Sequence, residues 1–160
     1  MNLKVGMLST IENRINDKVL DTNLTTPSAI TINSLLNDML LSGCEYCIIE
    51  ASSHAIDQDR IYGLIIDIAI LTNVSHDHLD YHKTFKDYLN SKLHLFNKLL
   101  RKSSTIITDK TIPEYKKIKK ISLNKQLNLK TIGNAGSTLS MINHEYMDEK
   151  QIIKIKYKNN

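Results

Sequence analysis

Short apolar runs that end in polar residues place the strongest constraint on the fold of this chain. Residues 46–49 form one such run, which ends at Glu50. Residues 65–71 form a second run, which ends at Thr72 and Asn73. Runs of this kind are typical of strands that are buried on both faces of a parallel sheet. Helical patterns alternate with them, so the sequence predicts an α/β layer with right-handed crossovers.

Further helices and strands are expected before and after these two strands in the sequence. Apolar residues at helical spacing predict a helix in which Thr26 is the cap, Pro27 is the first residue and Gly43 marks the end. We expect strands over residues 4–11 and 105–108, and a long helix over residues 84–100. From about residue 119 onwards, β-like runs at 127–132, 138–142 and 152–157 alternate with polar turns. We therefore expect an α/β region over residues 1–118 and a small β-rich part over residues 119–160.

Composition excludes several classes of protein. With 160 residues, 41% of them hydrophobic, the chain is long enough to bury a core. It has no apolar stretch long enough to span a bilayer and no signal peptide, and two cysteines provide no disulfide framework. These features fit a cytoplasmic protein without a membrane partner. The net charge of +4 comes mostly from lysines without interleaved aromatics or arginines, which favours codon bias over a nucleic-acid surface.

Two strand ends carry groups suited to chemistry. In open parallel sheets, ligands bind beyond the carboxyl ends of the strands. Glu50 follows the first strand, and an acid at that place is suited to hold Mg²⁺ beside nucleotide phosphates, although a solvated loop carboxylate is the alternative. Residues 76–82 follow the second strand and contain three histidines and two aspartates. Their spacing matches no zinc motif, so metal binding, phosphate binding and a purely structural role all stay open.

A single lysine stands out in the helix over residues 84–100. Tyr88, Phe96 and other apolar residues form one stripe at 100° per residue, and Lys92 falls in the middle of it. Burial there favours the neutral amine, which reacts with CO₂ to give a carbamate. The pattern alone favours the alternative, a lysine whose stem lies on apolar surface while its ammonium reaches water.

Glycines and cysteines narrow the possibilities further. None of the five glycines belongs to a G-x-x-G-x-x-G sequence or to one that ends in Gly-Lys-Ser/Thr, so the 160 residues contain no phosphate-binding loop. Cys44 and Cys47 have the spacing of a redox pair, but they lie where a helix gives way to a strand rather than the reverse. We interpret both cysteines as packing residues.

Taken together, the motifs resemble the central, ATP-handling domain of the Mur ligases, in particular of those that form the tripeptide. The resemblance covers about half of the chain and rests on the order and spacing of several segments. These are Leu24-Thr25-Thr26-Pro27, Glu50-Ala51-Ser52-Ser53-His54-Ala55 with Gln58 and Arg60, residues 72–82, and Lys92 with Phe96. The resemblance implies a P-loop NTPase-like, mostly parallel sheet with flanking helices.

The resemblance also assigns roles. Five residues are expected to contact UDP-MurNAc-dipeptide: Thr25, Thr26, Ser52, Gln58 and Arg60. Glu50 and His78 are expected to hold Mg²⁺, and Lys92 to be carbamylated so that its added carboxylate supports a second Mg²⁺. The implied reaction uses ATP to join meso-diaminopimelate or L-lysine to UDP-MurNAc-L-Ala-D-Glu. Leu24, His76 and the pair Asp57 and Asp59 depart from the family pattern and are expected to tune substrate binding without undoing the match.

Three functions are therefore carried forward. The first is a middle fragment of such a ligase, inactive alone and working with the missing ligase segments in trans. The second is a non-catalytic remnant or partner subunit. The third is a metal-dependent phosphohydrolase that uses Glu50, His78, Asp80 and His82, although such an enzyme has no need of the Thr-Thr-Pro and Ser-Ser-His segments. The residues that select the added amino acid are expected outside this chain.

Overall fold

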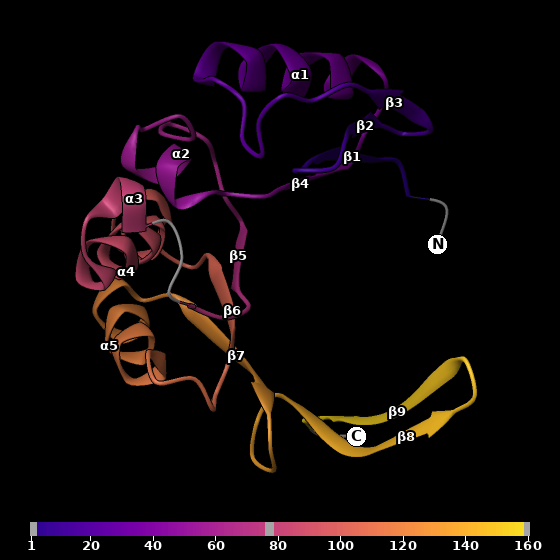
Figure 1. Ribbon diagram of the computed structural model, residues 1–160, viewed down its shortest axis with the longest axis vertical. Helices are drawn as coiled ribbons and strands as arrows, with labels where there is room; N and C mark the ends of the chain where they lie inside the picture. Colours follow the sequence, from indigo (N-terminus) through magenta and orange to yellow (C-terminus); the bar gives the residue numbers. More distant parts are fainter. Residues whose placement is uncertain (1–2, 76–78, 159–160) are drawn as a thin grey trace. The chain divides into compact units, whose positions relative to one another are not determined.

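The computed structural model describes residues 3–75 and 79–158, and these residues form two compact units. Unit 1 consists of Met1–Leu64 and His78–His94, and unit 2 consists of Ile65–Asp77 and Leu95–Asn160. Each unit has its own sheet and its own helices (Figure 1). Within the described ranges, no helix is long and apolar enough to cross a membrane.

The sheet of unit 1 has the strand order β3-β2-β1-β4. Strand β1 (Val5–Leu8) pairs in parallel with β4 (Tyr46–Ile49) and antiparallel with β2 (Asn13–Ile15), which in turn pairs with β3 (Lys18–Leu20). The strand predicted over residues 4–11 is therefore shorter than expected. The hairpin of β2 and β3 was not predicted, because strands of three residues show no clear alternation of apolar and polar side chains.

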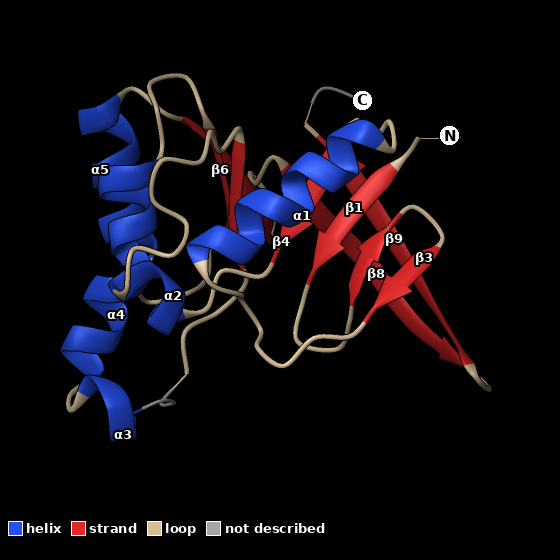
Figure 2. Cartoon of the chain, turned by 90° about the horizontal axis from the view of Figure 1, so that it is seen from above, coloured by secondary structure: helices blue, strands red, loops and turns tan. Residues whose placement is uncertain are grey.

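Helix α1 (Ala29–Leu41) lies along β1 and confirms the first predicted helix, but not its start (Figure 2). Ser28, rather than Thr26, is the N-cap, and its side chain accepts a hydrogen bond from the backbone N–H of Thr31. Pro27 precedes the helix. The predicted end is correct, because the chain leaves the helix at Ser42 and Gly43 adopts a left-handed φ of +76°.

Strand β4 has the predicted bounds but not the predicted burial. The exposed fraction is 58% for Tyr46 and 61% for Ile48, and both faces of the strand are open. The reason is that side chains of a strand are buried by what packs on the faces of the sheet. Helix α1 packs on β1, and β4, the last strand of the sheet, has no helix among its main contacts in the described part of the chain. The expectation of a strand buried on both faces is therefore wrong for β4.

The remainder of unit 1 is a group of short helices. Helix α2 (Ser53–Asp57) packs on α4 (Phe85–His94), and α3 (Leu79–His82) also packs on α4. Tyr88, Leu89 and Leu93 are the buried apolar side chains of α4. The predicted helix over residues 84–100 thus exists, although it continues from Leu95 to Leu99 as a π-helix, η1, which belongs to unit 2.

The sheet of unit 2 has the strand order β5-β6-β7-β8-β9. Its strands are β5 (Ile68–Leu71), β6 (Thr105–Asp109), β7 (Asn128–Gly133), β8 (Leu139–Met147) and β9 (Lys150–Tyr157). All neighbours pair in parallel except β8 and β9, which form the long antiparallel hairpin at the yellow end of Figure 1. The β-like runs expected after residue 119 are therefore confirmed as β7, β8 and β9.

Helix α5 (Tyr115–Lys125) covers part of the unit 2 sheet and was not predicted. Four of its residues are the lysines 116, 117, 119 and 120, which masked the apolar contribution of Ile118 in the sequence. Ile118 is fully buried, as are Ile106 of β6 and nearly all of Phe96 of η1. The helix crosses the boundary proposed near residue 119, which stays a prediction. The fold class is confirmed as mixed α/β with a mostly parallel sheet.

The two cysteines are free thiols with different surroundings. Cys44 is half-buried, and its Sγ lies 3.3 Å from Oδ1 of Asn16, to which it donates. Cys47 is an exposed residue. The pKa of its thiol is nevertheless raised to about 11, mainly by desolvation of the thiol and also by the neighbouring Cys44. A thiol with that pKa is protonated at neutral pH and reacts weakly as a nucleophile, which argues against a redox pair. The packing interpretation fits Cys44 better than Cys47.

The contact between β1 and α1 depends on a glycine. A Cβ atom built on Gly6 would lie 2.2 Å from Sδ of Met39, and Met39 is itself 2% exposed. Gly6→Ala is therefore expected to lower the free energy of unfolding by about 1–3 kcal/mol, because the buried Met39 has little room to move. Urea unfolding followed by circular dichroism measures this loss.

Met39→Ala provides the matched background for this substitution. It removes all three side-chain atoms that the new Cβ would contact. The cost of Gly6→Ala should therefore be smaller in Met39→Ala than in the natural sequence. An equal cost in both backgrounds would show that Met39 does not limit the space at Gly6.

Candidate functional site

The carboxyl ends of β1 and β4 bring Thr10 and Glu50 together. The two strands are parallel and end at Leu8 and Ile49, so the residues that follow them emerge at the same edge of the unit 1 sheet. The Glu50 carboxylate accepts two hydrogen bonds at Oε2, from the backbone N–H and from the hydroxyl of Thr10, each at 2.7 Å. Thr10 thus fixes the orientation of the Glu50 side chain.

Thr25 joins the same group of residues through its hydroxyl. The hydroxyl oxygens of Thr10 and Thr25 are 3.1 Å apart. The Thr10 hydroxyl therefore faces both the Glu50 carboxylate and the hydroxyl of Thr25. Thr25 is half-buried beside an exposed carboxylate. This arrangement leaves both residues within reach of a ligand from solvent.

Thr26 has a different position from its neighbour. It is 1% exposed, and its hydroxyl donates to the backbone carbonyl of Glu50 at 2.5 Å and accepts from the backbone N–H of Ser52 at 3.0 Å. The side chain therefore ties the segment before α1 to the segment after β4. Both hydrogen bonds of the buried Thr26 hydroxyl are made within the protein, so Thr26 has a structural role at the site.

Ser52 begins α2 and thereby positions the residues after that helix. Its Oγ accepts from the backbone N–H of Ala55 at 3.2 Å, which is the usual N-cap bond. The short helix ends at Asp57, and the chain then turns so that Nη1 of Arg60 donates to the backbone carbonyl of Thr26 at 2.8 Å. Nε of Arg60 also donates to Oε1 of Gln58 at 2.9 Å.

One connected set of hydrogen bonds therefore contains all five residues predicted to bind substrate, together with Glu50. One branch runs from the Glu50 carboxylate through Thr10 to Thr25. The other runs from the Glu50 backbone carbonyl to Thr26, and from Thr26 both to Ser52 and, through Arg60, to Gln58. We call this set the unit 1 network. Thr10 was not predicted, because the strand expected over residues 4–11 placed it inside a strand rather than after one, whereas β1 ends at Leu8.

Lys92 directly follows Ser91, a residue that connects α4 to the backbone of α2. Ser91 is buried, and its hydroxyl donates to the backbone carbonyl of Ser53 at 2.9 Å. Lys92 itself is half-buried, with its Nζ 5.0 Å from the centre of the Tyr88 ring. The predicted partial burial is confirmed. The ring contact fits a cation–π interaction, in which the amine is charged, as well as a lysine stem lying on apolar surface.

The His/Asp cluster is described only in part. His76, Asp77 and His78 lie outside the described residues, so the structure does not place the predicted Mg²⁺ ligand His78. His82 is buried, and its Nε2 is 2.9 Å from Oγ of Ser53, which gives it a structural contact. In the described part of the chain, no three His, Cys, Asp or Glu side chains are grouped as metal ligands.

Glu50 is the described residue that fits a metal best. Its carboxylate is exposed, one oxygen is fixed by Thr10, and no hydrogen bond to Oε1 is found among the described residues. Mg²⁺ prefers hard oxygen ligands and takes few of them from the protein. An oriented carboxylate with one available oxygen meets that requirement.

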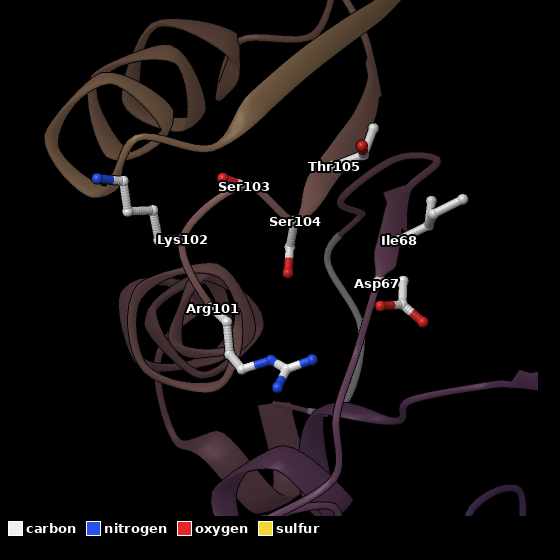
Figure 3. A pocket seen from close by; sticks show the side chains of 7 residues that line it. All are labelled: Asp67, Ile68, Arg101, Lys102, Ser103, Ser104 and Thr105. Carbon is white, nitrogen blue, oxygen red and sulfur yellow. The ribbon is translucent and has the colours of Figure 1, made fainter.

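Two open depressions in unit 2 lie away from this chemistry. One, of about 530 Å³, is lined by Asp67 and Ile68 and by residues 101–105 (Figure 3). The other, of about 550 Å³, is lined in part by Thr105, Asn128 and Tyr157. Both include the first residues of parallel strands, whereas ligands of such sheets bind at the carboxyl ends. We therefore place the candidate site in unit 1.

Curated proteins with a similar sequence match most of this chain but only a small part of their own length. The UDP-N-acetylmuramoyl-L-alanyl-D-glutamate–2,6-diaminopimelate ligase of Cytophaga hutchinsonii is 48% identical over 107 residues, which are 67% of this chain and 22% of that protein. The ligase of the same name from Parabacteroides distasonis is 50% identical over 99 residues, which are 62% of this chain and 20% of that protein. The chain thus spans about a fifth of the length of these curated relatives.

Solved structures agree with this result. A UDP-N-acetylmuramoyl-L-alanyl-D-glutamate–2,6-diaminopimelate ligase matches 96% of this chain and 31% of its own, with a TM-score of 0.83 and 25% identity. The MurF ligase of Thermotoga maritima in complex with ADP matches 98% of this chain and 32% of its own, with a TM-score of 0.60. At 14% identity, that second likeness concerns the fold alone.

A family model describes the same region from sequence. The model of the Mur ligase middle domain matches residues 1–159, which is nearly the whole chain. The chain therefore belongs to the Mur ligase middle-domain family.

Proposed function

We propose that this chain is part of a ligase that uses ATP to join 2,6-diaminopimelate to UDP-MurNAc-L-Ala-D-Glu, a step of peptidoglycan synthesis. The observation that carries the proposal is the unit 1 network. It connects Thr25 to the carboxylate of Glu50, and through Thr26 it connects Ser52, Arg60 and Gln58 to the backbone of Glu50. The names of the relatives favour 2,6-diaminopimelate over L-lysine as the added amino acid. This function implies a cytoplasmic location, where ATP is available.

The unit 1 network suits an anionic substrate. UDP-MurNAc-dipeptide carries phosphates and carboxylates, and Arg60 is the arginine of the network. A guanidinium has five N–H donors, and Arg60 uses three of them on Gln58 and Thr26. Two donors remain for a ligand within the described contacts. Because charged donors form the stronger hydrogen bonds, Arg60 is the residue on which substrate affinity should depend most.

Glu50, His78 and Lys92 provide the proposed metal ligands. The neutral amine of Lys92 adds to the carbon of CO₂ and releases one proton, which leaves a carbamate with two oxygens for Mg²⁺. Mg²⁺ held by these residues would supply positive charge that stabilises the transferring phosphoryl group. Glu50 supports this role with its fixed carboxylate, and Lys92 supports it with its half-buried position in α4.

Arg60→Ala tests substrate binding directly. Loss of charge-assisted hydrogen bonds worth about 1.5–3 kcal/mol should weaken binding of UDP-MurNAc-L-Ala-D-Glu by about 10-fold to 100-fold. Isothermal titration calorimetry on the 160-residue chain measures the change. Arg101→Ala is the matched control, because Arg101 is an exposed arginine of unit 2. Equal affinities for Arg60→Ala and the control would contradict the proposal.

A second experiment concerns the carbamate. A chain equilibrated with ¹³C-bicarbonate should show one carbamate signal in ¹³C NMR that disappears in Lys92→Arg, because arginine has no amine that adds to CO₂. Lys86→Arg, an exposed position on the same helix, should leave the signal unchanged. A spectrum without the signal in the natural chain, or with it in Lys92→Arg, would exclude carbamylation of Lys92.

The third experiment concerns catalysis by the chain alone. Without a phosphate-binding loop among its 160 residues, the chain lacks the backbone donors and the lysine that hold the β- and γ-phosphates of ATP. We therefore expect no ligation product from ATP, UDP-MurNAc-L-Ala-D-Glu and 2,6-diaminopimelate unless the remaining ligase segments are supplied in trans. Product formed by the purified chain would refute this expectation. Phosphate released without the amino acid would favour the phosphohydrolase instead.

A further inference from the structure

Tyr81 connects helix α3 to the end of helix α2 through its hydroxyl. The amide nitrogen of Gln58 lies 3.1 Å from Oη of Tyr81, and Oη lies 2.9 Å from Oδ2 of Asp57. Gln58 also contacts Arg60 through its amide oxygen. Tyr81 therefore belongs to a line of contacts that runs from Asp57 through Gln58 and Arg60 to the backbone of Thr26.

Arg60 at one end of this line and the Asp57 carboxylate at the other determine which group donates in each hydrogen bond between them. Arg60 only donates, so the amide oxygen of Gln58 must face it and the amide nitrogen must face Tyr81. Oη of Tyr81 then accepts from Gln58 and donates its single proton to the Asp57 carboxylate, which only accepts. A hydroxyl meets both requirements at this point, whereas the phenyl ring of phenylalanine meets neither.

Neighbouring aromatic rings hold the Tyr81 ring in place. Its centroid lies 4.1 Å from that of His54 on α2 and 4.8 Å, edge to face, from that of His82. His82 is buried, and its Nε2 lies 2.9 Å from Oγ of Ser53. The hydroxyl of Tyr81 is thus fixed relative to α2 by packing that does not involve the hydroxyl itself. Tyr81→Phe removes one oxygen atom and keeps this packing.

We propose that Tyr81 is a positioning residue for substrate binding, which it serves by fixing the Gln58 amide so that Gln58 orients the guanidinium of Arg60. This role rests on the proposed function, because Arg60 is there a substrate ligand. Gln58 is exposed, and its hydrogen bond with Tyr81 restricts rotation of the amide. With the amide oxygen held toward Arg60, Nε and Nη2 are both engaged, and the two unused N–H donors face a constant direction.

Calorimetry with UDP-MurNAc-L-Ala-D-Glu on the 160-residue chain tests this role. Tyr81→Phe is expected to weaken binding by about fivefold to tenfold, the effect of losing a net hydrogen bond in the line. Tyr62→Phe is the matched control, because Tyr62 is 70% exposed in the same unit, and it should bind as the natural chain does. Affinity equal to that of the natural chain in Tyr81→Phe would overturn the proposal.

A double substitution separates positioning from general stability. If Tyr81 acts through Gln58, then adding Tyr81→Phe to Gln58→Ala should cause no further loss of affinity. A purely structural effect of Tyr81→Phe would instead add its full loss in both backgrounds and would contradict the proposal. Asp57→Asn keeps an oxygen that accepts from Tyr81, so it should bind close to the natural chain, whereas Asp57→Ala should resemble Tyr81→Phe.

The side-chain Nε–H of Arg60 provides a readout that needs no substrate. In ¹⁵N NMR its exchange with water should be slow in the natural chain and in Tyr62→Phe, and faster in Tyr81→Phe. Unchanged exchange in Tyr81→Phe would overturn the positioning role. A natural chain that does not bind the dipeptide substrate would overturn the proposed function and this role with it. Binding by the natural chain that Tyr81→Phe leaves intact would overturn the role of Tyr81 alone.

Discussion

The parallel pairing of β1 with β4 is the constraint on which the candidate site depends. It brings the segments that follow the two strands to one edge of the sheet, where Thr10 meets Glu50, 40 residues further along the sequence. The buried hydroxyl of Thr26 then binds the backbone of Glu50 and Ser52. Without that pairing, neither the orientation of the carboxylate nor the start of α2 would be defined, and Arg60 would lose its place beside the Thr26 carbonyl.

Most residues of this arrangement could be singled out from the sequence because their motifs are local, whereas their roles in binding stay predictions. Glu50, Ser52, Gln58 and Arg60 lie within eleven consecutive residues, and Thr25 lies just before a helix with clear apolar spacing. Contacts between distant segments and the choice of the N-cap residue could not be predicted, and each has a physical reason. Contacts such as that of Tyr81 with Gln58 join residues 23 positions apart and depend on how α3 packs, which no local pattern records. The N-cap at Ser28 depended on a choice among neighbouring hydroxyls that only the path of the chain decides.

Burial was the least predictable property, because it depends on which elements pack over each strand rather than on strand composition. Tyr46 and Ile48 of β4, like Ile68 and Ile70 of β5, are apolar and exposed, and both strands are the last of their sheets. The expectation of two buried faces therefore failed for both. For β5, the inner residues Ala69 and Leu71 are buried as expected. Helix α5 shows the opposite case, since its lysines concealed a buried face around Ile118.

The central claim is that the unit 1 network is a binding site for UDP-MurNAc-L-Ala-D-Glu. Two-dimensional ¹H–¹⁵N NMR of the 160-residue chain, recorded during titration with this compound, tests it most directly. The account predicts that the backbone signals of Thr10, Thr25, Ser52, Gln58 and Arg60 shift together with one dissociation constant, while those around Asp67 and Arg101 in unit 2 stay in place. Shifts confined to unit 2, or no shifts at saturating concentration, would contradict it.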